Sequence, residues 1–481
     1  MRAHRVALCA VLAGVAAPAA AQVVAGNGTS IGEQPAVTTH LEQAQIESGQ
    51  LSLMEIIAAG EALFTARFNA LDGQGRPAST GTGAPRLPVQ PAFSRTSGPD
   101  ANACSSCHND PVAGGNGDFT VNVFVLAQAL DPVTFDTSAA NSNERNTIGM
   151  HGAGAIEMLA REMTVALHAI RDEALAAAQD TGTPQTRSLR TKGVSFGEVT
   201  AMPDGRIDPT GIEGVDWDLI VKPFHQKGAV VSLREFTNNA MNHHHGIQTT
   251  ERFGVDTDPD MDGYTNELTV GDITAVTLFQ AAMPVPGRQR PANAELRKVL
   301  VQGERLFADT GCAGCHRPRL RLEDAMYSEP NPFNPPGNAN PQDIGTVSFN
   351  LTSEGMGNRL KPLGRGAVVR AYTDLKRYNL CDEELAHFCN EQISQGTLAG
   401  FADPASFTVP DQPRPTEAFL TRRLWDVGSS DPYGHRGDLT TMTEAIHFHG
   451  GDARESRDAF FALSDYSQAT IIEFLKSLQI K

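Results

Sequence analysis

Two five-residue motifs with the pattern C-x-x-C-H constrain this chain more than any other feature. They are Cys104-Ser-Ser-Cys107-His108 and Cys312-Ala-Gly-Cys315-His316. At this spacing two thiols add across the two vinyl groups of one porphyrin, and the following histidine reaches the iron from the proximal side. A single C-x-x-C would also suit zinc or a redox dithiol. Two complete copies predict two covalently bound haem c groups.

The N-terminus carries an export signal. Arg2 and Arg5 precede an apolar run over residues 6–17, and residues 19–21 form an A-x-A cleavage site. This pattern predicts a cleaved signal peptide over residues 1–21, because the run is shorter than the roughly 18 apolar residues of a membrane span. No later stretch reaches that length, so we expect no transmembrane segment. Haem attachment to c-type cytochromes takes place outside the bacterial inner membrane, so both signals indicate a periplasmic protein.

Length and charge narrow the function classes. A chain of 481 residues exceeds one ordinary domain and can bury a sizeable core. A net charge of −17 argues against nucleic-acid binding. The charge would suit a small basic electron-transfer partner, and it equally suits a protein that is acidic for solubility alone.

A weak internal repeat precedes the two haem motifs. Gly60-Glu-Ala-Leu-Phe64 resembles Gly303-Glu-Arg-Leu-Phe307. In the second copy the haem cysteines follow at once, whereas residues 69–100, rich in Gly, Pro, Ser and Thr, intervene in the first and predict an inserted loop. The Pro-rich stretch 283–291 breaks any helix. The sequence therefore predicts two cytochrome c-like domains, over residues 22–286 and 287–481.

Hydrophobic spacing predicts helices in both halves. Apolar residues recur at helical intervals over 155–179, and 232–242 has the same character. Residues 190–227 indicate turns and short strands. Within the closing segment 459–478, Ser464-Asp465 can cap a final helix that contains Ile471 and Leu475. The predicted fold class is mainly α, with two cytochrome c-like haem domains and long irregular loop insertions in the N-terminal half.

The chain resembles the di-haem oxidoreductase family of peroxidase type, whose relatives include the bacterial di-haem cytochrome c peroxidases and the di-haem enzyme that matures the tryptophan-derived cofactor of methylamine dehydrogenase. The resemblance covers nearly the whole mature chain. It rests on both haem motifs and on segments 145–157, 218–224, 424–428 and 435–451. The family usually shows His-Asp-Gly-Arg where this chain has His435-Arg436-Gly437-Asp438.

The resemblance implies a sixth ligand for the second haem. The segment Met442 to His449 matches the register at which peroxidases place methionine and the cofactor-maturing enzyme places tyrosine. His449 there would give bis-histidine ligation and a lower potential than methionine. The alternative is that His449 caps the turn at Gly450. His447 lies two residues away and would point elsewhere on a helix.

The first haem shows no such ligand. Peroxidases place a distal histidine soon after the first motif, but residues 109–130 contain none. Its sixth position is either open or filled by one of the downstream candidates His151, His225, His243, His244 and His245. A short surface run is the plainer interpretation of the last three. Peroxide cleavage needs a distal acid or base, and the candidate catalytic groups are Glu157 and Arg145.

Two further features concern a possible calcium site and a possible disulfide. Asp258, Asp260 and Asp262 open a D-x-D-x-D-G loop like those that bind calcium, with Glu267 as a further ligand, against a plain acidic turn. Cys381 and Cys389 are the remaining mature cysteines, and an oxidising compartment favours a disulfide. A continuous helix would hold them roughly 12 Å apart, beyond the reach of a bridge, so the chain must bend between them.

We therefore expect a periplasmic di-haem c-type oxidoreductase of peroxidase type. One haem, the first, would react with hydrogen peroxide or another small oxidant, and the second would supply electrons from a small soluble donor, a cytochrome or copper protein. The alternatives are a non-enzymatic di-haem electron-transfer cytochrome and an oxidase of an organic or protein substrate.

Overall fold

A computed structural model describes residues 30–74, 101–118, 120–122, 144–259, 262–389 and 418–480, together with the backbone of 23–24. The predicted signal peptide, Asp260 and most of the predicted first-half loop lie outside these residues. Within them, every helix falls short of the length or the hydropathy that a bilayer-spanning segment requires.

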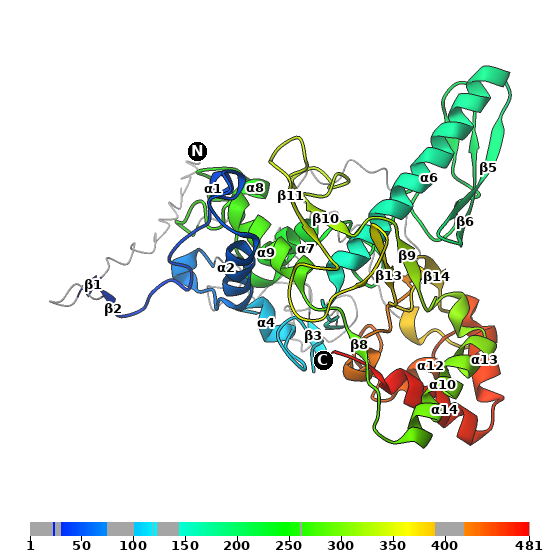
Figure 1. The fold of residues 1–481 in the computed structure, drawn as a ribbon. Helices are drawn as coiled ribbons and strands as arrows, with labels where there is room; N and C mark the ends of the chain where they lie inside the picture. The colour runs from blue at the N-terminus through cyan, green and yellow to red at the C-terminus, as the bar shows by residue number, and fades with distance from the viewer. Residues whose placement is uncertain are drawn as a thin grey trace, which may run out of the picture.

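Two helix pairs organise the molecule, one near each end of the ribbon in Figure 1. Helix α2 (Leu53–Thr65) packs against α9 (Val270–Ala282), and α10 (Ala294–Asp309) packs against α14 (Asp465–Lys476). The helices α2 and α10 carry the two copies of the repeat, and Ser464 caps α14 as predicted. The chain therefore builds the same helix pair twice.

In the first pair, a glycine lets the two helix backbones touch. A β-carbon added to Gly60 would overlap the backbone carbonyl of Ala275 in α9. One turn later, the ring of Phe64 lies 5.2 Å from that of Phe279 and 6.3 Å from the imidazole of His108. Phe64 thus links the helix crossing to the first haem motif.

The second pair repeats this arrangement. A β-carbon on Gly303 would overlap the backbone carbonyl of Thr470 in α14. The ring of Phe307 lies 5.6 Å from that of Phe474 and 6.3 Å from the imidazole of His316. The repeat therefore encodes the same contact in both halves. Its glycine lies where the two helices cross, and its phenylalanine lies between the second helix of the pair and the motif histidine.

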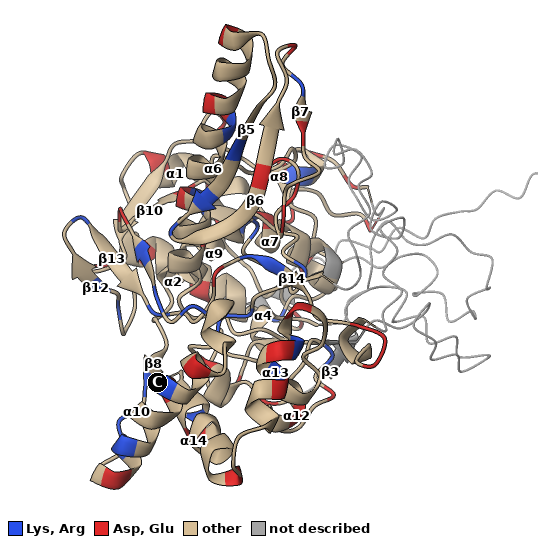
Figure 2. Ribbon diagram, turned by 90° about the vertical axis from the view of Figure 1, so that its right-hand side faces the viewer, with Lys and Arg blue, Asp and Glu red and all other residues tan. Residues whose placement is uncertain are grey.

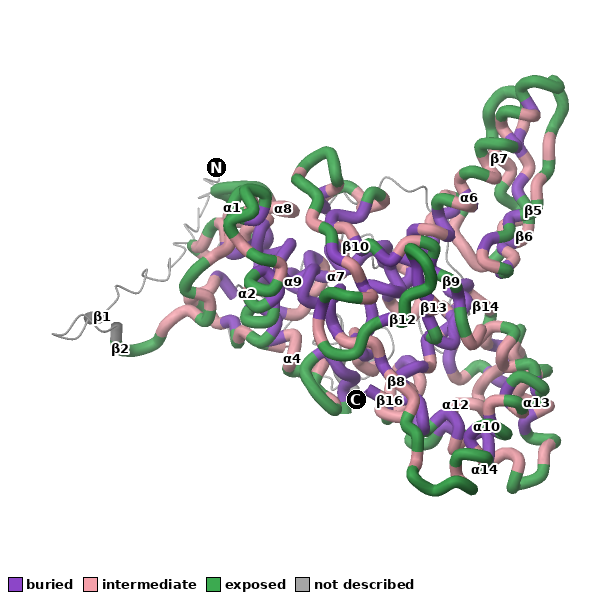
Figure 3. The backbone as a smooth tube through the Cα atoms, in the orientation of Figure 1, coloured by how far each residue is buried: buried purple, intermediate pink, exposed green. Residues whose placement is uncertain are grey.

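An arm projects from the body of the molecule (Figures 1 and 3). It consists of α6 (Ala153–Thr181) and the antiparallel strands β5 (Gln185–Thr191), β6 (Val194–Ala201) and β7 (Ile207–Asp208). The start of α6, over residues 153–161, is buried in the body, and its distal part is more exposed. The predicted helix and short strands of this region are confirmed.

Helix α7 (Leu233–Ala240) continues into a π-helical turn at Met241–His245. The hydroxyl of Ser232 accepts a hydrogen bond from the backbone of Glu235 and caps α7. The helix predicted over 232–242 is therefore present, and its end is wider than an α-helix. Such π-helical turns are frequent at functional sites.

The second half contains an insertion of short strands between its haem motif and α12 (Met442–His447). These are β9 (Leu320–Leu322), β10 (Met326–Glu329), β11 (Val347–Asn350), β12 (Lys361–Leu363), β13 (Gly366–Val369), β14 (Arg377–Asn379) and β15 (Ala418–Leu420). They form the antiparallel sheets β10-β11, β12-β13-β9 and β14-β15. The mainly α expectation is therefore corrected to a mixed fold, and insertions are not confined to the N-terminal half. Strands of three or four residues are too short to show a period in the sequence.

Further short elements are β1 (Val23–Val24), β2 (Ser30–Ile31), α1 (Gln43–Glu47), α4 (Cys104–Cys107), β3 (Thr120–Asn122), β4 (Glu144–Asn146), α8 (Thr250–Phe253), β8 (Gly287–Arg288), α13 (Arg454–Phe461) and β16 (Leu478–Gln479).

Leu322, Tyr327 and Phe349 of the inserted strands belong to the same buried cluster as Leu159 and Phe279 of the first half. The two halves therefore share a core, and the boundary at residue 286 stays a prediction.

Candidate haem-binding site

One cavity reaches both C-x-x-C-H motifs. It encloses about 2150 Å³, and its lining includes Cys104, Cys107, His108, Cys312, Cys315 and His316. Small-molecule pockets measure roughly 300–1,000 Å³, so this cavity is more than twice as large as an ordinary one. Its volume suits two large cofactors side by side.

The first motif forms the short helix α4, with His108 directly after it. The backbone N–H of His108 donates to the carbonyl of Cys104 at 3.0 Å, which holds both cysteines on one turn. Neither cysteine forms a disulfide, and burial raises the pKa of Cys104 to about 12. Burial lowers the pKa of His108 to about 4, so the imidazole is neutral, as metal coordination requires.

The second motif forms a 3-10 turn over Cys312–Gly314. The Nδ1 atom of His316 lies 3.2 Å from the backbone carbonyl of Tyr372, which orients the ring as second-shell partners of metal-bound histidines do. Burial lowers the pKa of His316 to about 4, and the proximity of His449 adds to the shift. The two histidines therefore lie near each other.

These residues fit haem c at both motifs. Each motif offers two thiols on one turn, a neutral histidine and access to the cavity. The buried guanidinium atoms Arg422 Nη1 and Arg423 Nε in the same lining have no hydrogen-bond partner, as expected where an anionic group is to bind.

His449 follows α12 and lines the cavity. Its Nδ1 atom lies 2.6 Å from the carbonyl of Ala445, so Nδ1 carries the proton and Nε2 keeps its lone pair. His447, in contrast, is exposed and lies beside Phe461 and Arg457. The structure thus places His449, and not His447, where the predicted ligand belongs.

The turn after His449 is held by the predicted disulfide region. Cys381 and Cys389 form a disulfide with Cα atoms 6.2 Å apart, so this prediction is confirmed. The chain bends at Asp382, whose carboxylate accepts backbone N–H groups of Leu385 and Gly451. The disulfide loop therefore anchors the segment that carries His449.

The histidine candidates for the first haem separate into two groups. His225, His244 and His245 line the cavity, and the last two lie close enough to lower the pKa of His108. His151 does not line it, because it is buried with Nδ1 3.0 Å from the carbonyl of Gly114. The side chain of His243 lies outside the described residues.

His245 contacts the first motif directly. Its Nε2 atom lies 3.3 Å from the sulfur of Cys104, and its Nδ1 atom lies 2.7 Å from the carbonyl of Ala101. Its ring is buried against Phe68.

Glu157 lies away from the cavity. Its carboxylate accepts hydrogen bonds from Arg161 at 2.8 Å, from Asn331 at 2.9 Å and from the backbone N–H of Leu233 at 2.8 Å. The side chain is fully buried, and it is absent from the cavity lining. This geometry gives Glu157 a structural role and does not support the predicted catalytic one. Arg145 lies in β4, and its side chain is outside the described residues.

The acidic loop does not assemble a cation site within the described residues. The carboxylate of Asp258 accepts the backbone N–H groups of Asp262 and Gly263, while that of Glu267 is buried and accepts the N–H of Gln248. No group of three potential ligands gathers there or elsewhere in the described chain. Calcium binding stays a prediction, since Asp260 lies outside that part.

Two segments of the family resemblance meet beside the cavity. A β-carbon on Gly152 would overlap the ring of Trp425, and one on Gly154 would overlap the carbonyl of Ala281. Trp425 is buried, which identifies it as a packing residue. In the 435–438 segment, His435 lines the cavity and Arg436 forms an ion pair with Asp438 at 3.1 Å.

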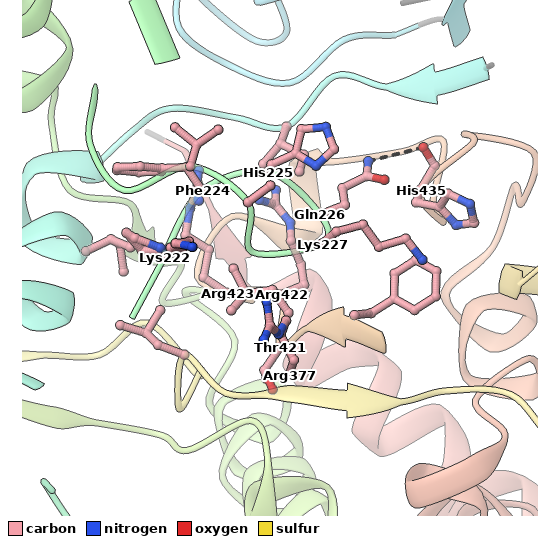
Figure 4. A pocket seen from close by; sticks show the side chains of 18 of the residues that line it. Lys222, Phe224, His225, Gln226, Lys227, Arg377, Thr421, Arg422, Arg423 and His435 are labelled. Carbon is pink, nitrogen blue, oxygen red and sulfur yellow. Dashed lines mark hydrogen bonds between the residues drawn. The ribbon is translucent and has the colours of Figure 1, made fainter. Parts of the chain in front are cut away.

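The sequence interpretation missed the basic residues of the cavity. Figure 4 shows Lys222, Arg377, Arg422 and Arg423 gathered in one part of it. The dipeptide Arg422-Arg423 directly before the Leu424-Trp425 segment was the available signal, because two charges in an otherwise apolar, structured segment need a partner.

Comparisons with known proteins give little further guidance. No model of a known family matches the chain, and no curated protein matches it by sequence. A hydrazine synthase of Kuenenia stuttgartiensis is 14% identical, covers 99% of this chain and 100% of its own, and has a TM-score of 0.34. A MauG-like protein associated with microbial copper homeostasis is 14% identical, covers 59% of this chain and 77% of its own, and has a TM-score of 0.25. TM-scores this low do not establish a shared fold.

Proposed function

We propose that this protein is a di-haem c-type oxidoreductase of peroxidase type. One observation supports it most: a single cavity joins two C-x-x-C-H motifs, each held by the same crossing of two helices. Bound haem would supply a redox-active iron, with an open coordination position for hydrogen peroxide or another small oxidant.

The chain's own residues differ between the two motifs in a way that suits two tasks. At the second, His316 and His449 are neutral imidazoles lining the same part of the cavity, a pair suited to a six-coordinate electron store. At the first, His244 and His245 both lie near His108 and line the cavity, and a histidine beside the motif suits a distal group at a site that admits an oxidant.

Location and partner belong to the same proposal. The predicted signal peptide supports a periplasmic location. Electrons would come from a small soluble donor, a cytochrome or copper protein. Figure 2 shows acidic and basic residues interspersed over the ribbon, so the net charge of −17 would attract a basic donor by its overall field.

Peroxide consumption tests the proposal. The half-reduced holoprotein should consume hydrogen peroxide, with the first spectral change at a high-spin haem, and electrons from an added donor should sustain turnover. The Cys104→Ala/Cys107→Ala variant keeps the second motif and should lose turnover. Two low-spin, six-coordinate haems in every redox state, without turnover, would instead identify an electron-transfer cytochrome.

A further inference from the structure

The cavity wall contains basic residues that are already neutralised. Lys222 and Arg377 both bind Asp216, at 2.6 and 2.5 Å, and Lys222 also lies 3.4 Å from Asp218, so two carboxylates face these two cations. Lys376 forms an ion pair with Glu213 at 3.1 Å. Because these cations have carboxylate partners within the protein, they need no further anion.

Arg422 and Arg423 differ from them. One terminal nitrogen of Arg422 lies 3.4 Å from Asp426 and 3.3 Å from the amide oxygen of Asn116, while its other terminal nitrogen is buried without a partner. Arg423 is 9% exposed and makes no hydrogen bond or ion pair with any described residue. Burial lowers the pKa of Arg423 to about 9, and the charge of Arg422 contributes.

The local charges therefore do not balance. Among the described residues, the two guanidinium groups face one carboxylate, that of Asp426, which leaves one positive charge beside the cavity. Enclosing an unpaired ion costs several kcal/mol. An anion in the cavity beside the pair would offset this cost.

The pair also stands between the two haem motifs. The backbone carbonyl of Arg422 lies beside the imidazole of His316. Its side chain contacts Asn116, in the loop after the first motif, and the same Asn116 oxygen accepts the N–H of Gly149 at 2.7 Å. An anion held here is within reach of both attachment sites.

We propose that Arg422 and Arg423 bind haem carboxylates in the gap between the two motifs. Haem c carries two propionate groups, and a planar guanidinium suits a carboxylate because it binds both oxygens at once. This inference rests on the proposed attachment of two haems. A positive charge held beside a haem disfavours its oxidised, more positive state, so the pair raises the midpoint potential of a haem it contacts.

The test compares Arg422→Gln, Arg423→Gln and the double variant with the parent holoprotein. Intact mass counts the haems, and a spectroscopic redox titration measures both midpoint potentials. All variants should keep two haems, and the glutamine variants should lower at least one potential, most in the double variant. Arg423→Lys should restore part of the shift. Arg377→Gln is the matched control, because it lines the same cavity but Lys222 remains to neutralise Asp216, and its potentials should match the parent.

The other possible results distinguish a wrong assignment of the arginine pair from a wrong proposed function. Unchanged potentials in both glutamine variants with two haems attached would overturn the assignment. A parent protein without two haems would instead overturn the proposed function. If acetate shifts the parent spectrum but not that of the double variant, while potentials agree, the pair binds a free carboxylate and the haem assignment is wrong. If the glutamine variants do not fold, the propionate-bending bands of the resonance Raman spectrum in the parent and in Arg423→Lys decide, since identical bands would exclude the contact.

Discussion

The two halves hold their C-x-x-C-H motifs with the same kind of helix crossing but differ in the groups around the motif histidine. Both cross their helices at a glycine, Gly60 or Gly303, and both place a phenylalanine against the motif histidine. Around His316 the structure adds Tyr372 on one ring nitrogen and His449 nearby. Around His108 it adds the π-helical turn Met241–His245.

Under the proposed function, the difference separates the parts of the chain that would attach a cofactor from those that would tune it. The shared helix pairs hold the C-x-x-C-H motifs, so they supply attachment. The unshared segments, α12 with its disulfide loop and α7 with its π-helical turn, supply the remaining groups around each motif. Under the proposed function, coordination and activity would therefore be set by the parts of the two halves that do not repeat.

The largest expected effect is loss of a whole cofactor. Cys104→Ala/Cys107→Ala and Cys312→Ala/Cys315→Ala should each remove one haem, because each thiol pair belongs to its own helix crossing. Intact mass and haem-stained denaturing gels count the haems that remain. If either pair abolished both attachments, the two halves would not be separate attachment units.

Next in size is the loss of one iron ligand. His449→Ala should convert one low-spin haem to a high-spin or water-bound form and raise its potential, while His245→Ala should leave that same haem unchanged. Absorption and electron paramagnetic resonance spectra report the spin states. His447→Ala is the control, since this side chain is exposed. An unaltered spectrum for His449→Ala would exclude the ligand.

A substitution at Glu157 tests whether its buried hydrogen bonds stabilise the first half. Its bond to Leu233 fixes the start of α7, and its pair with Arg161 is buried. Glu157→Gln leaves Arg161 as an uncompensated buried charge, so the free energy of unfolding should fall by about 3–5 kcal/mol. Chemical denaturation measures it. A selective loss of peroxide turnover at unchanged stability would restore the catalytic interpretation.

Smaller changes should follow at the helix crossings. Gly60→Ala and Gly303→Ala each introduce a methyl group against a backbone carbonyl, and overpacking of this kind costs about 1–3 kcal/mol. Gly314→Ala serves as control because its methyl group would meet no atom within 4 Å. Equal unfolding free energies for all three variants and the parent would mean that the crossings are not the shared framework.

The sequence predicted the repeated framework because its signals are local. Helix α6, the cap at Ser464 and the disulfide could all be anticipated from spacing or residue type. The strands of the second-half insertion could not, because segments as short as β9 show no period and pair only through distant contacts.

The candidate site was likewise predicted only in part. The motif residues follow from fixed spacing and His449 from the family resemblance, whereas the burial of Glu157 depends on Asn331, 174 positions away. The isolation of Arg423 depends on which carboxylates are absent around it, and no local pattern encodes an absence. Sequence reasoning therefore found the groups that we propose attach a cofactor and missed those that surround them.

The smallest effect concerns the loop that holds His449, which distinguishes the second half. Bonds from Arg454 and from backbone N–H groups, including that of Gly451, hold the pKa of Asp382 below its ordinary range. A carboxyl group with a depressed folded-state pKa stabilises the protein above its unfolded pKa of about 3.9, and this contribution is lost as the pH falls below that value. The stability difference between parent and Asp382→Asn should therefore be greatest near neutral pH and shrink toward about pH 2. Urea unfolding at several pH values measures it, with Asp465→Asn, at the exposed start of α14, as control. Parallel curves for parent and Asp382→Asn would show that Asp382 does not anchor this loop, and the second half would lose the feature that most clearly separates it from the first.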